Sequence, residues 1–337
     1  MSYKQMTGNI ISATKVEPDG VFENSAASGV WSLQEQYDYR RGGNWPSTDN
    51  PAARGIFFGA EPSHNTFNNV IQSIQIATTG NATDFGDMSY AHAYGDSTGN
   101  STRSLQFGGS NGGSGFDIIE YVTSATAGNT TDFGDMSTGR YLNRCFGSAT
   151  RSCTAGGPDT DIEYVNPAST GNVTDFGDLS SAFSRGAGFG STTRGIVVDG
   201  DSNKIEYVTI ASTGNATDFG DSAANKFADT MNGCSNSTIG ITSGYSQSDA
   251  DIYKLTIASL GNMTDFGGNT TDARNNLTAL ASKIRGVFAG GLNSSDNRVN
   301  TMDYITFASA GNASDFGDLT TGSYATSATS NNHGGLA

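Results

Sequence analysis

Five arginines occupy one position in five copies of a short apolar segment, and such a set could bind anions. The segments read RGIFFGA, RSLQFGG, RSCTAGG, RGIVVDG and RGVFAGG, and they begin at Arg54, Arg103, Arg151, Arg194 and Arg285. A sixth segment has Ile239 at this place, so a symmetric fold would give an incomplete ring. One interpretation is a site for an anion or an acidic sugar. The preferred one pairs each arginine with an acid that holds sheets in register, because repeated charges in repeat proteins are mostly structural.

Carboxylates are the second group that could do chemistry, since glycosidases need two of them facing each other across a cleft. Glu120, Glu163 and Glu206 recur at one position of a repeat, whereas a catalytic pair is expected at positions unique to one copy. Glu61 and Asp96 have no counterparts in the other copies, yet nothing in the sequence places them at one cleft. We therefore expect a protein without enzymatic activity. The alternative is a polysaccharide-degrading enzyme or a sugar-binding lectin.

Other motifs resemble functional sites but lack the necessary context. Asp-Phe-Gly binds magnesium in protein kinases, but here it recurs without the other kinase motifs. Residues 199–203 (DGDSN) offer alternate oxygens as a calcium loop does, but Ile210 stands where that loop has glutamate. His64, His92 and His333 have no Cys or carboxylate at ligand spacing. The sequence predicts neither a metal ion nor a cofactor.

An eight-residue repeat positions these side chains. It reads GNATDFGD, GNTTDFGD, GNVTDFGD, GNATDFGD, GNMTDFGG and GNASDFGD, and its aromatic residues are Phe85, Phe133, Phe176, Phe219, Phe266 and Phe316. Their spacings are 48, 43, 43, 47 and 50 residues, which suits propeller blades of four short strands. We expect each phenylalanine to lie on an outer strand and pack between neighbouring blades. The Asn-x-Ser/Thr triplets inside the repeat are interpreted as turns whose side-chain oxygen binds a nearby N–H, not as glycan acceptors.

The two ends of the repeat region predict how the ring closes. It opens at Arg54 with the second strand of a blade, and an inner-strand pattern over 322–330 follows the last repeat. Residues 322–330 are therefore expected to complete the blade formed by 54–87, which leaves no open sheet edge. The predicted fold is an all-β, six-bladed β-propeller over residues 54–337, preceded by a docking segment over residues 1–53.

The first 53 residues differ from the repeats. Ser32 and Glu35 fit a capping box, in which each side chain satisfies an exposed backbone donor at a helix start, so a helix is expected over 33–41. The two tryptophans flank this helix, and they either pack it onto the propeller or dock it on another subunit. The expected docking residues are Trp31, Leu33, Tyr37 and Trp45.

Composition restricts the partners. The net charge is −15 and the pI about 4.4, which argues against a nucleic-acid surface. There is no 18-residue apolar run, so no membrane insertion is expected, and the N-terminus does not resemble a secretory signal. Three cysteines are too few for a disulfide framework and are expected to be buried thiols. The first candidate contact loops are 63–69, 98–102, 243–250 and 292–300, whose lengths vary most.

The stretch GNIISATKVEPDGVFENSAASGVWSLQEQYDYRRGGNWP resembles a segment of structural proteins of tailed bacteriophages, particularly marine and cyanobacterial phages. The repeats, such as IEYVTIASTGNATDFGDS, resemble kelch-like propeller units of virion and tail-fibre proteins. This resemblance implies a virion appendage assembled in the host cytoplasm. Residues 1–53 would bind other virion proteins and the propeller would contact a host-surface glycan or protein. Phage fibres are often trimers, so a homo-oligomer is compatible with it, although no heptad pattern demands one.

Overall fold

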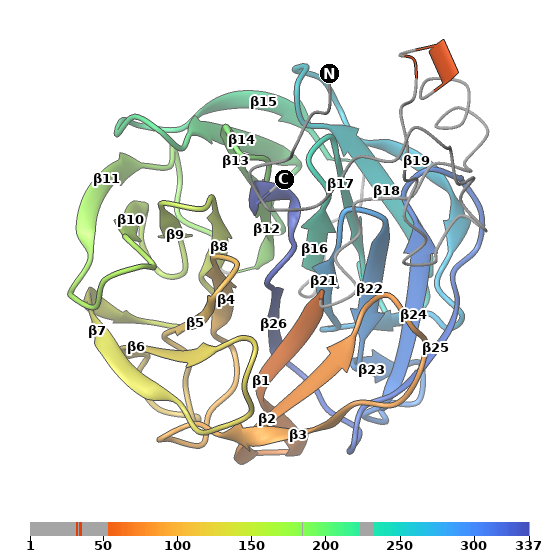
Figure 1. The fold of residues 1–337 in the computed structure, drawn as a ribbon, viewed down its shortest axis with the longest axis horizontal. Coiled ribbons are helices and arrows are strands. Elements are labelled where there is room, and N and C mark those ends of the chain that lie inside the picture. Colours follow the sequence, from red (N-terminus) through yellow and green to blue (C-terminus); the bar gives the residue numbers. More distant parts are fainter. Residues whose placement is uncertain (1–31, 33, 36–52, 184, 223–231, 337) are drawn as a thin grey trace, which may run out of the picture. The chain divides into compact units, whose positions relative to one another are not determined.

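The computed structural model describes residues 32, 34–35, 53–183, 185–222 and 232–336. Its strands form six antiparallel four-stranded sheets arranged around one axis as a six-bladed β-propeller (Figure 1), which confirms the predicted architecture and blade number. A two-stranded sheet lies beside the last blade. Among the described residues of this region, the one helical element is the short 3₁₀ helix η1, Gly334–Leu336.

The strands are given blade by blade, from the innermost to the outermost. Blade one holds β26 (Ser327–Ser330), β1 (Arg54–Ser63), β2 (Thr66–Gln75) and β3 (Thr83–Asp87). Blade two holds β4 (Asp96–Gly99), β5 (Arg103–Phe107), β6 (Phe116–Thr123) and β7 (Thr131–Arg140). Blade three holds β8 (Arg144–Gly147), β9 (Ser152–Ala155), β10 (Asp161–Val165) and β11 (Thr174–Asp178).

The other three blades follow the same order. Blade four holds β12 (Gly186–Gly190), β13 (Arg194–Asp199), β14 (Lys204–Thr209) and β15 (Thr217–Asp221). Blade five holds β16 (Asn232–Ser235), β17 (Ile239–Ser243), β18 (Asp251–Thr256) and β19 (Thr264–Asn269). Blade six holds β21 (Thr278–Ala281), β22 (Arg285–Ala289), β24 (Thr301–Thr306) and β25 (Ser314–Asp318), next to β20 (Arg274–Asn275) and β23 (Leu292–Asn293).

The innermost strand of blade one comes from the other end of the chain. Strand β26 pairs antiparallel with β1, with Gly55 opposite Ser330 and Phe58 opposite Ser327. Beyond the strand, the Arg54 N–H donates to Asn331 Oδ1 at 2.8 Å. Strand β1 therefore has a partner on both sides, as the central strands of the other blades have.

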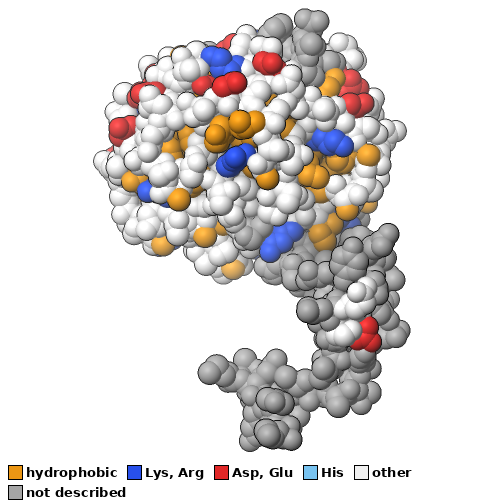
Figure 2. All heavy atoms as spheres, turned by 90° about the horizontal axis from the view of Figure 1, so that it is seen from above, with side chains coloured by type: hydrophobic (Ala, Val, Ile, Leu, Met, Phe, Trp, Pro, Cys, Tyr) orange, Lys and Arg blue, Asp and Glu red, His pale blue; other side chains and the backbone are white. Residues whose placement is uncertain are grey.

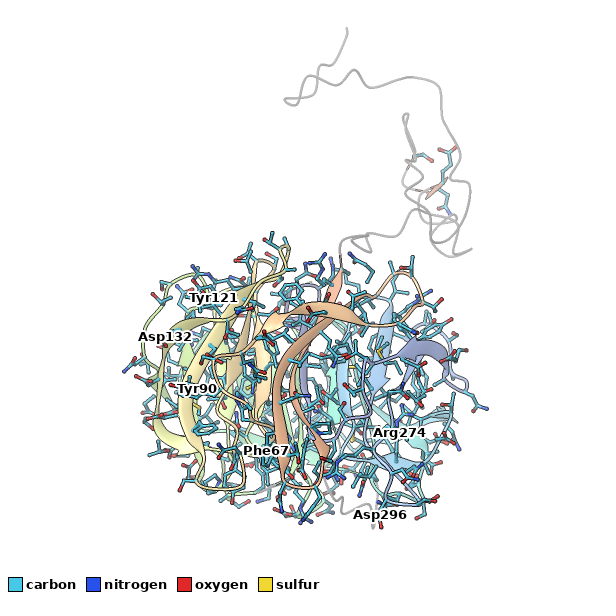
Figure 3. The ribbon with its side chains drawn as sticks, turned by 90° about the horizontal axis from the view of Figure 1, so that it is seen from below. Phe67, Tyr90, Tyr121, Asp132, Arg274 and Asp296 are labelled. Atoms are coloured by element: carbon cyan, nitrogen blue, oxygen red, sulfur yellow. The ribbon has the colours of Figure 1, made fainter. Side chains whose placement is uncertain are left out.

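Strand direction defines two faces of the ring. All innermost strands begin at one face, which we call the mouth face, and end at the other, which we call the plug face. At the plug face η1 covers the central channel. A Cβ added to Gly334 would lie 2.3 Å from Asn236 O, and one added to Gly335 would lie 1.8 Å from Gly147 O, so only glycine fits there. In the edge-on view of Figure 3, Tyr121 lies toward one face, and Phe67 and Asp296 lie toward the other.

Six hydrophobic clusters fill the spaces between neighbouring blades. Each contains one repeat phenylalanine together with residues of its own blade and the next. Phe219 of blade four, for example, belongs to the same cluster as Leu255 of blade five. The six phenylalanines are all buried on the outermost strands, as predicted.

The Gly-Asn turn of each repeat joins two blades. Gly128 N donates to Phe85 O at 2.7 Å and Thr130 N to Asp87 O at 2.9 Å, while Asn129 Oδ1 accepts from Asp87 N at 3.0 Å. The side-chain bond recurs all round the ring, with Asn81, Asn172, Asn215, Asn262 and Asn312 as acceptors. The expected local bond of this asparagine is thus wrong, because its N–H donor belongs to the preceding blade. These joints cover the outer edge of every blade, where an open strand could otherwise pair with another chain.

Contacts divide the chain into residues 1–51 and residues 52–337. In the first unit, Ser32 N and Oγ donate to Glu35 Oε2 at 2.9 and 2.8 Å, and Glu35 N donates to Ser32 Oγ at 3.2 Å. These are the bonds of a capping box, and residues 34–35 are helical. The rest of the helix expected over 33–41, and the docking residues Trp31, Leu33, Tyr37 and Trp45, lie outside the described residues.

Candidate functional site

The loops that differ most in length from blade to blade lie at the mouth face. The plug-face turns between first and second strands are short and alike, at 100–102, 148–151, 191–193, 236–238 and 282–284. Their mouth-face counterparts between second and third strands differ widely, from 64–65 in blade one to 290–300 in blade six. Of the four candidate contact loops, 63–69, 243–250 and 292–300 lie at the mouth face. The fourth, 98–102, lies at the plug face.

The five repeated arginines lie at the plug face, where each joins its blade to the next. Their Nη1 atoms donate to main-chain oxygens of that blade, for example from Arg151 to Ile210 O at 2.7 Å and from Arg194 to Ile257 O at 2.8 Å. The other acceptors are Ser124 and Ala125 for Arg54, Pro167 for Arg103, and Ile76 for Arg285. Within the described ranges none of the five forms an ion pair, so the expected acid partners are wrong. Ligand binding by these arginines stays a prediction.

An aromatic ring supports four of these guanidinium groups. Arg103, Arg151, Arg194 and Arg285 lie 4.6, 4.6, 4.9 and 4.6 Å from the ring centres of Tyr121, Tyr164, Tyr207 and Tyr304. In blade one the tyrosine is replaced by Ser73, and Arg54 lies 5.6 Å from the Phe85 ring instead. Figure 2 accordingly shows Lys and Arg side chains scattered singly, several beside hydrophobic ones, without a continuous basic patch.

In blade five the cation comes from the third strand instead of the second. Ile239 stands where the other blades have arginine, and Lys254 stands where most have tyrosine. The Lys254 Nζ lies 5.7 Å from the centre of the Phe266 ring. The cation over an aromatic ring is therefore kept in this blade, although it comes from the third strand.

The repeated glutamates are also joints between blades. Glu120, Glu163 and Glu206 are buried, and each accepts a backbone N–H from the preceding blade, at 3.3, 3.3 and 3.2 Å. The donors are Ser89, Ser137 and Ser180. Gln72 and Asp303 occupy the same position in blades one and six and accept from Thr320 and Thr271. In these five blades the position holds an acceptor for the neighbouring blade, whereas blade five has Tyr253 there, whose hydroxyl donates to Asp251 Oδ2 of its own blade at 3.1 Å.

Glu61 belongs to a polar cluster of the mouth face that is unique to blades one, two and six. Its Oε1 accepts from Arg298 Nη2 at 2.8 Å, and its Oε2 accepts from the Tyr94 hydroxyl. The Arg298 guanidinium lies 5.4 Å from the centre of the Tyr324 ring. Burial and the bond to Glu61 raise the pKa of Tyr94, so this phenol stays protonated. The sequence indicated Glu61 but not its partners, because Arg298 comes from the opposite end of the chain.

Asp96 lies in blade two at the start of an innermost strand. Its Oδ2 accepts from Cys145 N at 2.7 Å. Burial raises the pKa of Asp96 to about 6, against the opposing effect of Arg144. The two acids unique to one blade are thus held by separate partners, Glu61 by Arg298 and Tyr94, and Asp96 by the backbone of blade three.

A backbone collar surrounds a cavity at the mouth of the channel. The collar consists of four residues, each two positions before an innermost strand and each with a left-handed backbone. They are Tyr94, Leu142, Asn276 and Ala325, with φ of 64°, 59°, 54° and 56°. Leu142 N donates to Tyr94 O at 2.6 Å, Tyr94 N to Ala325 O at 3.1 Å, and Ala325 N to Asn276 O at 3.4 Å. The cavity offers about 20 Å³ to water, and Gly95, Arg144, Asn232, Leu277 and Thr326 also line it. Non-glycine residues in this conformation store strain and often mark functional sites.

The central channel below the collar is narrow and polar in part. It offers about 40 Å³ to water, and its walls include Ser97, Gly188 and the buried thiols of Cys145 and Cys234. At the plug face His333 Nε2 donates to Gly99 O at 3.0 Å, while His333 Nδ1 accepts from Gly335 N at 3.2 Å. Burial lowers the pKa of His333 and so favours the neutral ring that these two bonds require. All three cysteines are free and buried, as expected.

Aromatic side chains gather around the connections between blades one, two and three. In Figure 3 Phe67 lies toward the mouth face, and Tyr90 lies about midway between the two faces. Tyr90 is 54% exposed and Tyr141 is 40% exposed, which makes them two of the three exposed large hydrophobic residues in the described ranges. Tyr90 contacts Phe116, with ring centres 6.2 Å apart, and Phe67 contacts Tyr94 at 6.4 Å. The third exposed residue, Leu260, lies in a plug-face turn.

The described residues contain no group of three His, Cys, Asp or Glu side chains placed to hold a metal ion. Residues 199–203 form a hairpin turn in which Asp199 Oδ1 accepts from Asp201 N at 2.8 Å. No helix within the described ranges is long and apolar enough to cross a membrane. No protein-family model matches the chain, and no curated protein is significantly similar to it.

Proposed function

We propose that this protein is a non-enzymatic component of a phage virion, in a tail fibre, baseplate or other appendage. In this proposal residues 1–53 dock to other virion proteins, and the kelch-like propeller presents its mouth face to a host-surface glycan or protein.

One observation carries the binding part of the proposal. The charged residues that recur in the blades are used between blades, as the bonds of Arg194 and Glu206 illustrate. The side chains unique to one blade gather at the mouth face instead, among them Glu61, Tyr94 and Arg298. Binding residues are commonly carried on variable loops that a rigid scaffold positions, and the mouth face has this organisation.

The docking part rests on the resemblance of residues 8–46 to tailed-phage structural proteins and on the place where this segment joins the propeller. The chain enters blade one at Arg54, on the plug face, next to Asn331. The mouth-face loops are therefore at the opposite end of β1 from the point of attachment.

The first test is binding of the full chain to an array of bacterial surface polysaccharides and to host cells. The variant Tyr141→Ala should weaken binding about fivefold, since stacking on such a ring contributes on the order of 1 kcal/mol. Leu260→Ala, an exposed apolar residue of the plug face, is the matched control and should bind as the unaltered chain does. An equal loss of affinity in the tyrosine variant and in Leu260→Ala, or no loss in either, would contradict recognition at the mouth face.

The second test concerns the virion. Cryo-electron microscopy of phage particles that contain this chain should show residues 1–53 buried against another virion protein. Absence of the chain from purified particles would overturn the virion assignment and leave the mouth face as the binding surface of a free lectin.

A further inference from the structure

Arg144 is a buried cation with unused hydrogen-bonding capacity. Its side chain is 5% exposed and lines the cavity inside the backbone collar. Nε donates to Gly186 O at 2.6 Å and Nη1 donates to Asn143 O at 2.8 Å. Across the described residues, Nη2 has no hydrogen-bond partner and no acid within ion-pairing distance. A buried charge is costly unless it is paired, so this position favours an incoming anion.

The neighbouring acid compensates Arg144 only in part. Asp96 directs its Oδ2 to the backbone of Cys145 at 2.7 Å and makes no ion pair within 4 Å with the guanidinium. Asp201 also acts on Arg144 through space. Because acids are already nearby, a singly charged group fits the electrostatics better than a phosphate dianion, which they would repel.

The remaining lining is suited to a small polar group. Asn232 uses its Oδ1 to accept from Gly233 N at 2.7 Å, which leaves its amide N–H groups available at the cavity. Asn276 and Thr326 also line the cavity, and the Thr326 hydroxyl donates to Ser323 Oγ at 3.2 Å. The space for water is about 20 Å³, enough for one or two water molecules or the two oxygens of a carboxylate, but not for a sugar ring.

We propose that the collar cavity binds the carboxylate of an acidic sugar, with Arg144 Nη2 as its principal donor and Asn232 as a second. This inference rests on the proposed function, since the sugar ring would remain outside the cavity on the mouth face. Tyr141, adjacent in sequence to the collar residue Leu142, is exposed there and offers a surface for stacking. The cation that recognises an acidic sugar is then Arg144, rather than the arginines of the plug face.

The experiment is isothermal titration of the full chain with glucuronate, with glucose as the neutral match. Glucuronate should bind and glucose should bind at least about tenfold more weakly, as loss of a charge-assisted hydrogen bond implies. Arg144→Gln should abolish the preference for glucuronate. Arg103→Gln, on the plug face, should retain it. Because removal of a buried arginine could prevent folding, Asn232→Ala is the second variant, and it should weaken glucuronate binding about threefold without altering Arg144.

Each outcome is decisive. Equal affinity for the two sugars, or equal loss in Arg144→Gln and Arg103→Gln, overturns the carboxylate site. Binding of neutral polysaccharides on the array without glucuronate binding overturns this site alone and leaves the proposed function intact. Failure of the unaltered chain to bind any saccharide or host cell contradicts both.

Discussion

At the scale of single residues, the plug-face arginines show why charge patterns are easier to locate than to interpret. Their position was evident from the repeats. Their partners were not, because a guanidinium bonded to a main-chain oxygen, such as Arg194 to Ile257 O, leaves no mark on the side-chain sequence of the acceptor. The acid partners expected for these arginines followed from the structural role that repeated charges usually have in repeat proteins, and they were wrong because the acceptors are main-chain oxygens.

Arg194→Ala should lower the free energy of unfolding by about 2 kcal/mol, because it removes both a cation–π contact and a hydrogen bond. Chemical denaturation with urea measures this loss. Arg54→Ala is the matched comparison, since Arg54 also donates to main-chain oxygens of the next blade but has Ser73 in place of the tyrosine, and the one ring beside it is the more distant Phe85. A larger loss in Arg54→Ala would show that stacking on tyrosine is unimportant.

His92 gives stability a dependence on pH. Burial lowers its pKa from 6.5 to about 4, with an opposing effect of the bond to Tyr90 O. The unfolded chain therefore binds more protons between pH 6.5 and pH 4, so the contribution of His92 is complete above pH 6.5 and is lost as the pH falls through this window. Asp96, whose pKa is raised to about 6, acts in the opposite direction between pH 6 and pH 3.8.

His92→Gln should reduce the slope of unfolding free energy against pH by up to about 1.4 kcal/mol per pH unit within that window. Urea titrations at pH 7, 6 and 5 measure the slope for both chains, and Asp96 and His333 cancel in the difference. Parallel slopes for the two chains would mean that the pKa of His92 is the same in the folded and the unfolded protein.

At the scale of elements, the repeat GNxTDFGD has two parts. Its Gly-Asn turn caps the outermost strand of the preceding blade by hydrogen bonds, and its TDFGD part forms the outermost strand of its own blade. The strand and its buried phenylalanine follow from local patterning and were predicted. The cap did not follow, because Asn129 binds an N–H of Asp87, which lies one repeat away in sequence. The same limit applies to the collar, whose left-handed residues share no residue type that a sequence pattern could detect.

Comparing substitutions at two glycines of this repeat distinguishes the cost of backbone strain from the cost of close packing. Gly86 and Gly80 have φ of 154° and 156°, but a Cβ on Gly86 would lie 2.3 Å from Gly128 O, whereas one on Gly80 has nothing within 4 Å. Gly86→Ala should therefore destabilise the protein by about 2 kcal/mol more than Gly80→Ala in urea unfolding. Similar losses would show that the joint between blades tolerates displacement.

At the scale of the whole molecule, closure depends on residues separated by nearly the full length of the propeller. The expected inner strand covered 322–330, and the strand in the structure is Ser327–Ser330, since the preceding residues form the collar. Blade number could be obtained from the repeat alone. The assignment of variable loops to one face required the direction of every strand, which becomes certain only when the sheets are assembled.

A chain that ends at Thr326 should lose the single cooperative unfolding transition and aggregate, because β1 would present an open edge to the channel. A chain that ends at Asn331 is the control. It keeps β26 and the bond to Arg54 but lacks η1, and it should remain monodisperse in analytical ultracentrifugation. Cooperative unfolding of the shorter chain would mean that the ring is stable without its closing strand.

The position of β1 between β26 and β2 also has a mechanical consequence. When a force on residue 53 acts along the axis of β1, the strand is bonded on both sides, so the hydrogen bonds of two ladders share the load and must shear together. A terminal strand bonded on one side only would peel from its sheet one bond at a time. The propeller is therefore joined to its N-terminal segment at a strand that resists pulling along its axis.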